Sequence, residues 1–216
     1  SPSEPLDSTR LLIEKQEACA KNANQLVFLR VDTHFPKLRS LSVSGMSLLP
    51  ALFFEHLPHS LVILSVPWNY NIFDSTIPLL PPHLTHLDIG KAKKITDSAI
   101  PLLPRSLLHL DLRSASLITP KCLPQLPPQL TFLNIALMES WKDATVAILP
   151  RTLLDLDIRS ATTLTDACAR HLPTMLTALN IDYNTNFTDA IALQLPRSLK
   201  RLSLSNCRRL TTGCIH

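Results

Sequence analysis

Leucine recurs at a fixed interval along most of this chain. An anchor leucine appears every 23 residues, eight times in all, with a second leucine three residues before each anchor and Val, Ile or Leu two residues after it. The pattern L-x-x-L-x-[LIV] shows no slip in its spacing, and its alternation around the anchor is typical of a β-strand with one buried face. The anchors are Leu41, Leu64, Leu87, Leu110, Leu133, Leu156, Leu179 and Leu202.

A short helical segment is predicted in the second half of each repeat. A further large apolar residue stands eight positions after the anchor, and in several repeats a Thr-Asp pair such as Thr96-Asp97 follows it. These residue types cap a helix by accepting its free N–H groups. Some prolines, such as Pro101, lie inside the segment, and others, such as Pro104, close it. The segments are therefore expected to be 3₁₀ helices or very short α-helices.

One repeat cannot fold alone. Burying about five or six aliphatic side chains at about 2 kcal/mol each does not offset the ordering of 23 residues at about 1–2 kcal/mol apiece. Stacked repeats bury each layer against the next and extend a parallel sheet through right-handed connections. The predicted fold is an α/β right-handed solenoid, with a concave parallel β-sheet and short helical or 3₁₀ segments on the convex side.

From about Leu38 onward the repeats resemble the leucine-rich-repeat superfamily. Their leucine-proline closure is similar to FNIP-type repeats and to bacterial effector repeats, and Ile95-Thr96-Asp97 is similar to the cysteine-containing repeats of F-box proteins. The resemblance implies a curved solenoid that binds other macromolecules. One departure lies five residues after the anchor, where the family usually places Asn or Cys and most repeats here have Ala or Met. The turns must therefore find other hydrogen-bond partners.

The chain divides into an N-terminal unit and the repeats. Residues 1–34 are predicted to contain a helix over residues 8–22 and a strand over residues 25–31, which cap the open edge of the first layer. A remnant of a preceding domain is the alternative interpretation. Residues 35–216 form the solenoid of eight repeats, the last of them incomplete. The last repeat shows no obvious polar cap, so either the sequence is truncated within the repeat array or its terminal edge is covered by a partner; self-association through that edge is a further alternative.

Alternate repeats resemble each other more closely than neighbouring repeats do. Cys122, Cys168 and Cys214 share one phase of a 46-residue period, and Arg113 and Arg159 share another position. Layers two apart are about 10 Å distant, beyond the roughly 7 Å Cα separation that a disulfide allows. These cysteines therefore cannot pair with one another. Buried thiols that pack as small apolar residues fit a reducing compartment, either cytoplasmic or nuclear.

Composition and charge narrow the classes of partner. The apolar share of 45% with only 5% aromatic residues indicates an aliphatic core, and the net charge of +4 is small for a protein whose main partner is nucleic acid. No apolar run reaches the roughly 18 residues of a membrane span, and the N-terminus lacks the pattern of a signal peptide. No membrane partner is predicted. A removed targeting peptide or a larger parent protein stays open.

The side chains that flank each anchor leucine are predicted to point out of the concave sheet. Carboxylates on neighbouring strands would lie about 5 Å apart and repel each other. Nearby histidines and arginines then either compensate this charge as a solvated network, or form with it the centre of a protein-binding surface flanked by aromatic anchors. The predicted partner-binding residues are His86, Asp88, His109, Asp111, Arg113, Phe132, Asn134, Asp155, Asp157, Arg159, Trp68 and Tyr183.

Other chemistries find less support in the sequence. The H-x-D pairs His86/Asp88 and His109/Asp111 have metal-ligating residue types, but neither a metal nor a cofactor is predicted. The chain has no glycine-rich phosphate loop, nucleophile elbow or paired C-x-x-C motif, so it is not expected to be an enzyme. The alternative function is binding of nucleic acid or an acidic polymer through the basic residues Arg197, Lys200, Arg201, Arg208 and Arg209.

The predicted function is therefore a protein-interaction module that binds a macromolecular partner on the concave sheet face. The resemblance suggests two specific forms of this function. One is substrate recognition for ubiquitination, and the other is action as a secreted effector. The identity of the partner stays open.

Overall fold

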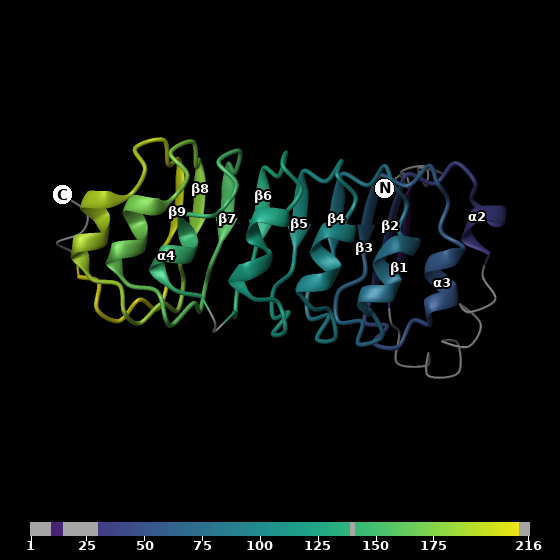
Figure 1. The fold of residues 1–216 in the computed structure, drawn as a ribbon, viewed down its shortest axis with the longest axis horizontal. Coiled ribbons are helices and arrows are strands. Elements are labelled where there is room, and N and C mark those ends of the chain that lie inside the picture. Colours follow the sequence, from purple (N-terminus) through teal and green to yellow (C-terminus); the bar gives the residue numbers. More distant parts are fainter. Residues whose placement is uncertain (1–9, 15–29, 139–140, 212–216) are drawn as a thin grey trace, which may run out of the picture.

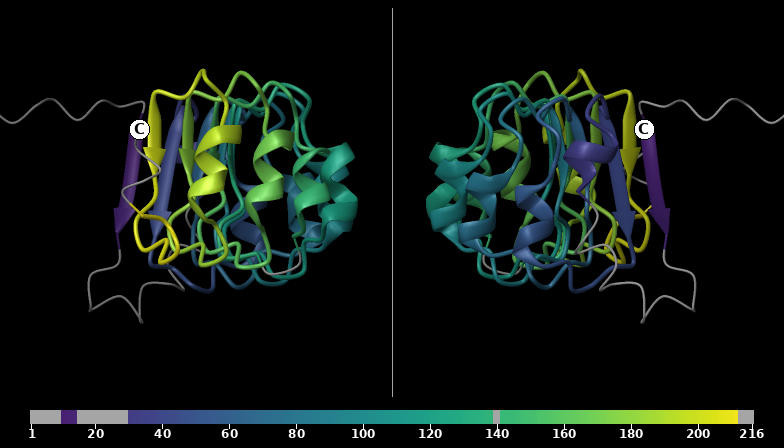
Figure 2. Two further views of the ribbon diagram at one scale, coloured as in Figure 1. Left: turned by 90° about the vertical axis from the view of Figure 1, so that its left-hand side faces the viewer. Right: turned by 90° about the vertical axis from the view of Figure 1, so that its right-hand side faces the viewer.

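Strands and short helices follow one another in a single row along the molecule. The structure is a computed structural model that describes residues 10–14, 30–138 and 141–211. Within these residues, nine strands form one sheet in the order β1 to β9, and every pair of neighbours is parallel. The described helices lie on one side of the sheet, and none of them covers its other side (Figures 1 and 2). We call the uncovered side the sheet face.

The bounds of the elements follow the 23-residue period from β2 onward. The strands are β1 Arg10–Glu14, β2 Ser40–Ser44, β3 Ile63–Ser65, β4 His86–Asp88, β5 His109–Asp111, β6 Phe132–Asn134, β7 Asp155–Asp157, β8 Ala178–Asn180 and β9 Arg201–Ser203. The helices are α2 Val31–His34, α3 Ala51–Glu55, η2 Asp74–Leu79, η3 Asp97–Leu102, η4 Pro120–Gln125, α4 Asp143–Val146, η5 Asp166–His171 and η6 Asp189–Gln194, where η denotes a 3₁₀ helix.

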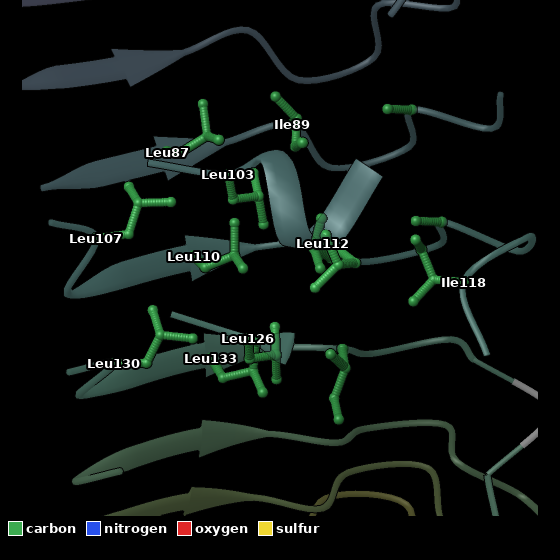
Figure 3. Packing of buried hydrophobic residues seen from close by; sticks show 14 of the residues in the cluster. Leu87, Ile89, Leu103, Leu107, Leu110, Leu112, Ile118, Leu126, Leu130 and Leu133 are labelled. Atoms are coloured by element: carbon green, nitrogen blue, oxygen red, sulfur yellow. The ribbon is translucent and has the colours of Figure 1, made fainter. Parts of the chain in front are cut away.

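The anchor leucines are in register across the sheet. Leu87 pairs with Leu110, and the equivalent leucines pair between all neighbouring strands from β2 to β9. Each anchor from Leu41 to Leu179 is at most 2% exposed. Figure 3 shows anchors such as Leu110 and Leu133 one above another inside this core. The predicted parallel sheet, with an aliphatic core behind it, is confirmed.

The 3₁₀ helices on the other side of the sheet also match the prediction. Helices η2, η3 and η4 each contain a proline, for example Pro101 in η3. The proline that closes a segment starts a turn into the next strand: the carbonyl of Pro104 accepts a hydrogen bond from the Leu107 amide at 3.3 Å. Proline therefore separates the helical segment from the strand without disturbing either.

A ladder of threonine and aspartate joins the N-termini of these helices. The Oγ1 atom of Thr96 accepts a hydrogen bond from the Ser98 amide at 3.3 Å, which is the predicted cap. The same hydroxyl donates to Asp74 of the preceding repeat at 2.5 Å, and the Thr96 amide donates to the other oxygen of that carboxylate at 2.8 Å. The same Asp-Thr contact joins Asp97 to Thr119, Asp143 to Thr165, Asp166 to Thr188 and Asp189 to Thr211.

At one place in this ladder, both the aspartate and the threonine of an Asp-Thr contact are replaced by other residues. Pro120 occupies the position of the aspartate, and Lys142, one repeat later, occupies the position of the threonine. A lone aspartate or threonine at this place would have no matching group to bind. The paired replacement therefore shows in the sequence that the two positions act together.

Restoring both residues should close this gap. Pro120→Asp alone and Lys142→Thr alone each supply half of the contact, whereas the double variant can form both hydrogen bonds. We expect the double variant to be about 1 kcal/mol more stable than the sum of the two single effects. Urea unfolding of the wild type, both single variants and the double variant measures this coupling. Strictly additive effects would contradict the ladder.

Every repeat from β2 to β9 leaves its strand through a residue in the left-handed backbone region. This residue lies four positions after the anchor; φ is 73° at Gly45 and 58° to 67° at seven residues that are not glycine, including Trp68, Leu137 and Tyr183. The Trp68 amide donates to the carbonyl of Gly90 in the next repeat at 2.8 Å. Hydrogen bonding between repeats thus imposes a conformation that costs free energy for a residue with a Cβ atom.

The turns close mainly through backbone hydrogen bonds. The Ala115 amide donates to the carbonyl of Leu112 at 3.0 Å, and the equivalent contact recurs in other repeats that lack Asn five residues after the anchor. Asn184 does occupy this position, and its Nδ2 atom donates to the carbonyls of Ile158 and Ile181. The sequence leaves the turns in need of hydrogen-bond partners, and the backbone supplies most of them.

The N-terminal prediction is wrong in part. Arg10–Glu14, expected to be helical, form strand β1, which pairs in parallel with β2. Leu11 and Ile13 are in register with Leu41 and Val43, so β1 also has apolar residues at the anchor position and two residues after it, although Leu12 between them is apolar too. A Leu-Leu-Ile run fits a strand as well as a helix, and pairing with β2 decides between them.

The predicted strand over residues 25–31 is also wrong where it can be checked. Val31 begins helix α2, while residues 25–29 lie outside the described residues, as does the remainder of the predicted N-terminal helix. The domain boundary between residues 34 and 35 stays a prediction, although β1 belongs to the same sheet as the repeats.

Two of the three cysteines in one phase of the 46-residue period can be placed. Cys122 and Cys168 are buried and free, and burial raises the pKa of each thiol to about 12. Both thiols are thus held neutral and pack as small apolar groups, as predicted. Cys214 lies outside the described residues.

Candidate functional site

Two rows of side chains flank the anchor leucines on the sheet face. The parallel register places the members of each row side by side. The outer row consists of the residues before the anchors: Ile63, His86, His109, Phe132, Asp155, Ala178 and Arg201. The inner row consists of the residues after the anchors: Ser65, Asp88, Asp111, Asn134, Asp157, Asn180 and Ser203.

The two rows differ in burial at the centre of the sheet. In the inner row, Asp111, Asn134 and Asp157 are only 6%, 3% and 7% exposed, whereas the other four inner-row residues are half-buried. In the outer row, most side chains are half-buried, Ala178 is buried, and Ile63 and Arg201 are exposed. The sequence predicts that both rows point outward, but from β5 to β7 only the outer row offers much surface to a partner.

The side-chain oxygens of aspartate and asparagine in the inner row accept hydrogen bonds from the backbone of the turns that follow them. The Oδ1 atom of Asp111 accepts a hydrogen bond from the Arg113 amide at 2.9 Å, and that of Asn134 accepts one from the Ala136 amide at 3.0 Å. Equivalent contacts form at Asp88, Asp157 and Asn180. These side chains therefore fix the turn at the end of each strand, which is a structural role.

Aspartate and asparagine alternate along much of the inner row. The Nδ2 atom of Asn134 donates to Oδ2 of Asp111 at 2.9 Å, and the Nδ2 atom of Asn180 donates to Oδ2 of Asp157 at 3.4 Å. A donor thus lies beside each of these carboxylates in place of a second negative charge. This alternation has the same 46-residue period as the cysteines and arginines.

Asp88 and Asp111 form the exception, because two carboxylates are direct neighbours there. Arg113 lies between them, with one guanidinium nitrogen 3.4 Å from Asp88 and another 3.3 Å from Asp111. Gly90 makes room for this arginine, since a Cβ atom at Gly90 would lie 2.7 Å from the Arg113 Nε atom. The predicted compensation by arginine is confirmed here and at Asp157, whose carboxylate lies 2.9 Å from Arg159.

Burial perturbs the protonation of the inner row. It raises the pKa of Asp111 from its ordinary value of 3.8 to about 6, and the neighbouring charge of Asp88 adds to this effect. Hydrogen bonds from Arg113 and Asn134 oppose the rise. Burial also raises the pKa of Asp157. Ionising these carboxylates therefore costs free energy in the folded protein.

Aromatic rings stack along the outer row. The ring centroids of His109 and Phe132 are 3.6 Å apart with their planes 5° from parallel, and those of His86 and His109 are 5.2 Å apart at 23°. Burial lowers the pKa of His109, and the charge of His86 lowers it further. The stack thus spans strands β4, β5 and β6 as a continuous ring surface that favours a neutral His109.

Beyond Phe132 the sheet face is hollowed above Ala178. This short side chain is 5% exposed, and a hollow of about 290 Å³ lies over it, with Phe132, Asp155 and Arg201 among its lining residues. The Arg201 guanidinium reaches across two strands to the Asp155 carboxylate, with 3.0 Å between Nη2 and Oδ2. The ring stack, the hollow and this ion pair form one continuous surface.

Trp68 and Tyr183 do not lie in either row. Both occupy the left-handed turn position after their strands, where they are 46% and 54% exposed. They are five repeats apart, or about 24 Å at the usual strand spacing. The structure therefore brings the predicted histidines, Phe132 and the acidic residues together but leaves the two aromatic anchors apart at the edge of the sheet.

Three other features considered in the sequence are a metal site, a membrane span and the C-terminal basic cluster. Among the described residues, no group of three His, Cys, Asp or Glu is arranged to hold a metal ion, and no helix is long and apolar enough to cross a membrane. All five residues of the basic cluster are exposed: Arg197, Lys200, Arg201, Arg208 and Arg209.

Protonation of Asp111 should stabilise the folded protein in mildly acidic solution. Because its pKa is about 6 when folded and 3.8 ordinarily, the stabilisation is fully present below about pH 4 and is lost as the pH rises through about 6. Relative to the variant Asp111→Asn, the unfolding free energy of the wild type should fall by about 2 kcal/mol between about pH 4 and pH 7.

Urea unfolding of both proteins across this pH range checks the prediction. If the variant loses a hydrogen bond, its unfolding free energy changes by the same amount at every pH. The pH dependence of the difference between the two proteins then still reports the ionisation of Asp111. Asp189→Asn serves as a control of opposite sign, because hydrogen bonds from Thr211 lower the pKa of Asp189. A pH-independent difference between wild type and Asp111→Asn would contradict the prediction.

Comparisons with known proteins give structural neighbours only. No family model matches the chain, and no curated protein sequence does. The leucine-rich repeat-containing protein LegL7 from Legionella pneumophila is 17% identical with a TM-score of 0.58, over 96% of this chain and 79% of that one. A chain of the Rad7 and Elc1 complex in yeast is 17% identical with a TM-score of 0.54, over 93% and 71%.

A third neighbour is a chain of the TLR13–ssRNA13 complex. It is 22% identical with a TM-score of 0.60, over 80% of this chain and 26% of that one. Each of these three matches extends over most of this chain.

Proposed function

Because this chain has the leucine-rich-repeat fold, we propose that it is a protein-interaction module that binds its partner on the sheet face. The observation that carries the proposal is the continuous outer row, where the ring stack from His86 to Phe132 meets the hollow above Ala178. No described helix covers this surface (Figure 2).

The outer row has the properties of a binding surface. Stacked rings present large, rigid areas that lose little conformational entropy on binding, and aromatic and arginine side chains are enriched among residues that dominate binding energy. Phe132 supplies such a ring at the edge of the hollow, and Arg201 supplies an exposed cation on its other side.

The inner row supports this surface from below. Asp111 and Asn134 are tied to their own turns and to each other, so they hold neighbouring strands in a fixed relation. We therefore assign partner contact to His86, His109, Phe132, Asp155 and Arg201. The buried aspartates and asparagines of the predicted set act as their support.

The hollow favours a partner that inserts one side chain. Its floor is the apolar Ala178, while Asp155 and Arg201 border it with opposite charges. An apolar side chain of the partner can fill the hollow, and polar groups around that side chain can pair with the two charged residues. We assign no catalytic activity to this open surface.

Two specific forms of this function follow from the resemblance to F-box-type and leucine-proline repeats. They are substrate recognition for ubiquitination and action as a secreted effector. The likeness to a chain of the Rad7 and Elc1 complex supports a role inside a protein assembly, and the likeness to LegL7 extends over most of both chains. The buried thiols suggest a cytoplasmic or nuclear location, and this location fits substrate recognition for ubiquitination.

Binding of nucleic acid or an acidic polymer through the C-terminal basic cluster is the second candidate. The exposure of its five residues favours it, but Arg201 is paired with Asp155. Self-association through the terminal edge stays a prediction; Leu202 in β9 is 41% exposed there.

Truncating the outer row should abolish partner capture. We expect Phe132→Ala with Arg201→Ala to weaken binding of the partner isolated with the wild type by at least about thirtyfold, since each is a central contact. Leu102→Ala with Lys121→Ala is the matched control, because it also removes one apolar side chain and one cation, but from the helix side, where both are exposed.

Immobilised wild type, the outer-row variant and the control variant, each with its thermal unfolding midpoint measured, test the proposal. The expected result is capture of one partner by the wild type and the control alone. Equal capture by all three folded proteins would place the binding surface elsewhere.

A further inference from the structure

A second surface lies where strands β3, β4 and β5 end. One repeat exposes Trp68 at 46% and Phe73 at 42% there, with Tyr70 half-buried between them in the sequence. The corresponding segment of the next repeat has the sequence GKAKK, which contains Lys91, Lys93 and Lys94. Aromatic side chains of one layer thus face lysines of the next. We call these residues the aromatic-lysine edge.

Two of the lysines lie over aromatic rings. The Nζ atom of Lys91 is 3.2 Å from the centroid of Trp68, and that of Lys94 is 4.5 Å from the centroid of Phe73. A ring in this position favours the charged ammonium group and restrains the flexible lysine stem. An ammonium group carries three N–H donors, and those that do not point at the ring stay available to a ligand.

A hollow opens beside the first of these pairs. It has a volume of about 320 Å³ and combines two ammonium groups, three hydroxyl groups and the apolar surfaces of tryptophan and leucine. No carboxylate of the described residues lines it. The lining residues are Trp68, Tyr70, Lys91, Lys93, Ser114, Ser116 and Leu137.

The charge around this hollow is mainly positive. The turn segments 66–73, 89–96 and 112–119 contain Lys91, Lys93 and Lys94 and no aspartate or glutamate, whereas the fourth segment, 135–142, which includes Leu137, contains Glu139 and Lys142. The nearest aspartates of these repeats are engaged elsewhere: Asp88 and Asp111 bind Arg113, and Asp97 binds Thr119 in the Thr-Asp ladder. The edge is therefore complementary to a negatively charged ligand.

The turn at Trp68 does not itself require this ring. Its φ of 67° lies in the left-handed region, which favours glycine. Equivalent turns are made with the small residues Gly45, Ser114, Ser160 and Asn206 and also with the larger Lys91, Leu137 and Tyr183. The turn therefore accepts either kind of side chain, and a tryptophan can be replaced there by a small polar residue.

We propose that the aromatic-lysine edge binds an acidic peptide segment. Carboxylates of the peptide contact Lys91 and Lys93, and an apolar side chain between them packs against Trp68 and Leu137. Single-stranded nucleic acid fits less well, because its bases stack on free aromatic faces and Lys91 covers one face of Trp68. This site is separate from the outer row, so it does not depend on the proposed function of the sheet face.

The probe is a fluorescein-labelled twelve-residue peptide in which glutamate alternates with leucine. A second peptide with glutamine in place of glutamate serves as its uncharged counterpart. By fluorescence anisotropy we expect the acidic peptide to bind at least about tenfold more tightly than its counterpart, with an affinity that falls as salt is added.

Two charge-matched variants locate the site. Lys91→Gln with Lys93→Gln should weaken the acidic peptide about tenfold. Lys37→Gln with Lys121→Gln changes the net charge equally but at exposed positions outside the aromatic-lysine edge, and it should change the affinity less than about twofold. Equal weakening by both variants would show unspecific attraction and overturn the proposal.

Trp68→Ser tests the apolar contact separately. Serine already occupies the equivalent turn position at Ser114, so the variant should keep its unfolding midpoint and lose affinity for the acidic peptide. Unchanged affinity would overturn the role of Trp68, and tighter binding of single-stranded oligothymidylate than of the peptide would overturn the choice of ligand. Phe132→Ala with Arg201→Ala should bind the probe normally, which keeps this test independent of the sheet-face proposal.

Discussion

The whole structure depends on the burial of one repeat against the next. A 23-residue unit with a strand of three residues and a six-residue 3₁₀ helix has no core of its own, and only in-register stacking takes the anchor leucines out of water. The same stacking brings equivalent positions of successive repeats side by side. Any side chain that recurs, or alternates with a suitable partner, can therefore form a ladder along the molecule.

Two polar ladders use this geometry, one on each side of the core. On the helix side, Thr96 caps its own 3₁₀ helix and binds Asp74 of the repeat before it. On the sheet side, Asp111 holds its own turn and accepts a hydrogen bond from Asn134 of the repeat after it. Both arrangements satisfy backbone groups at the ends of very short elements, where few regular hydrogen bonds are available. They commit most of the regularly spaced aspartates to structure and leave the outer row for the proposed partner contacts.

The two candidate binding sites lie where residues differ from the equivalent residues of the other repeats. Ala178 interrupts a row of larger side chains and leaves the hollow beside Phe132. Trp68 and Lys91 occupy a turn position that has glycine, serine or asparagine in four other repeats, and together they give the edge an aromatic and basic character. A repeat scaffold tolerates such substitutions because each layer is supported by its neighbours on both sides.

The sequence by itself determined the period, the strand centres, most of the 3₁₀ helices and most of the threonine caps, because each depends on contacts that recur in successive layers. Only the tertiary structure decided that Leu11 and Ile13 belong to a strand, since pairing with β2 selects between two conformations that the run Leu-Leu-Ile allows. The tertiary structure also decided that the Asp111 side chain is buried and that Trp68 lies at the edge of the sheet, outside both rows. The direction of a side chain at a strand end is set by the hydrogen bonds of the turn to the next repeat, and alternation along a strand no longer applies there.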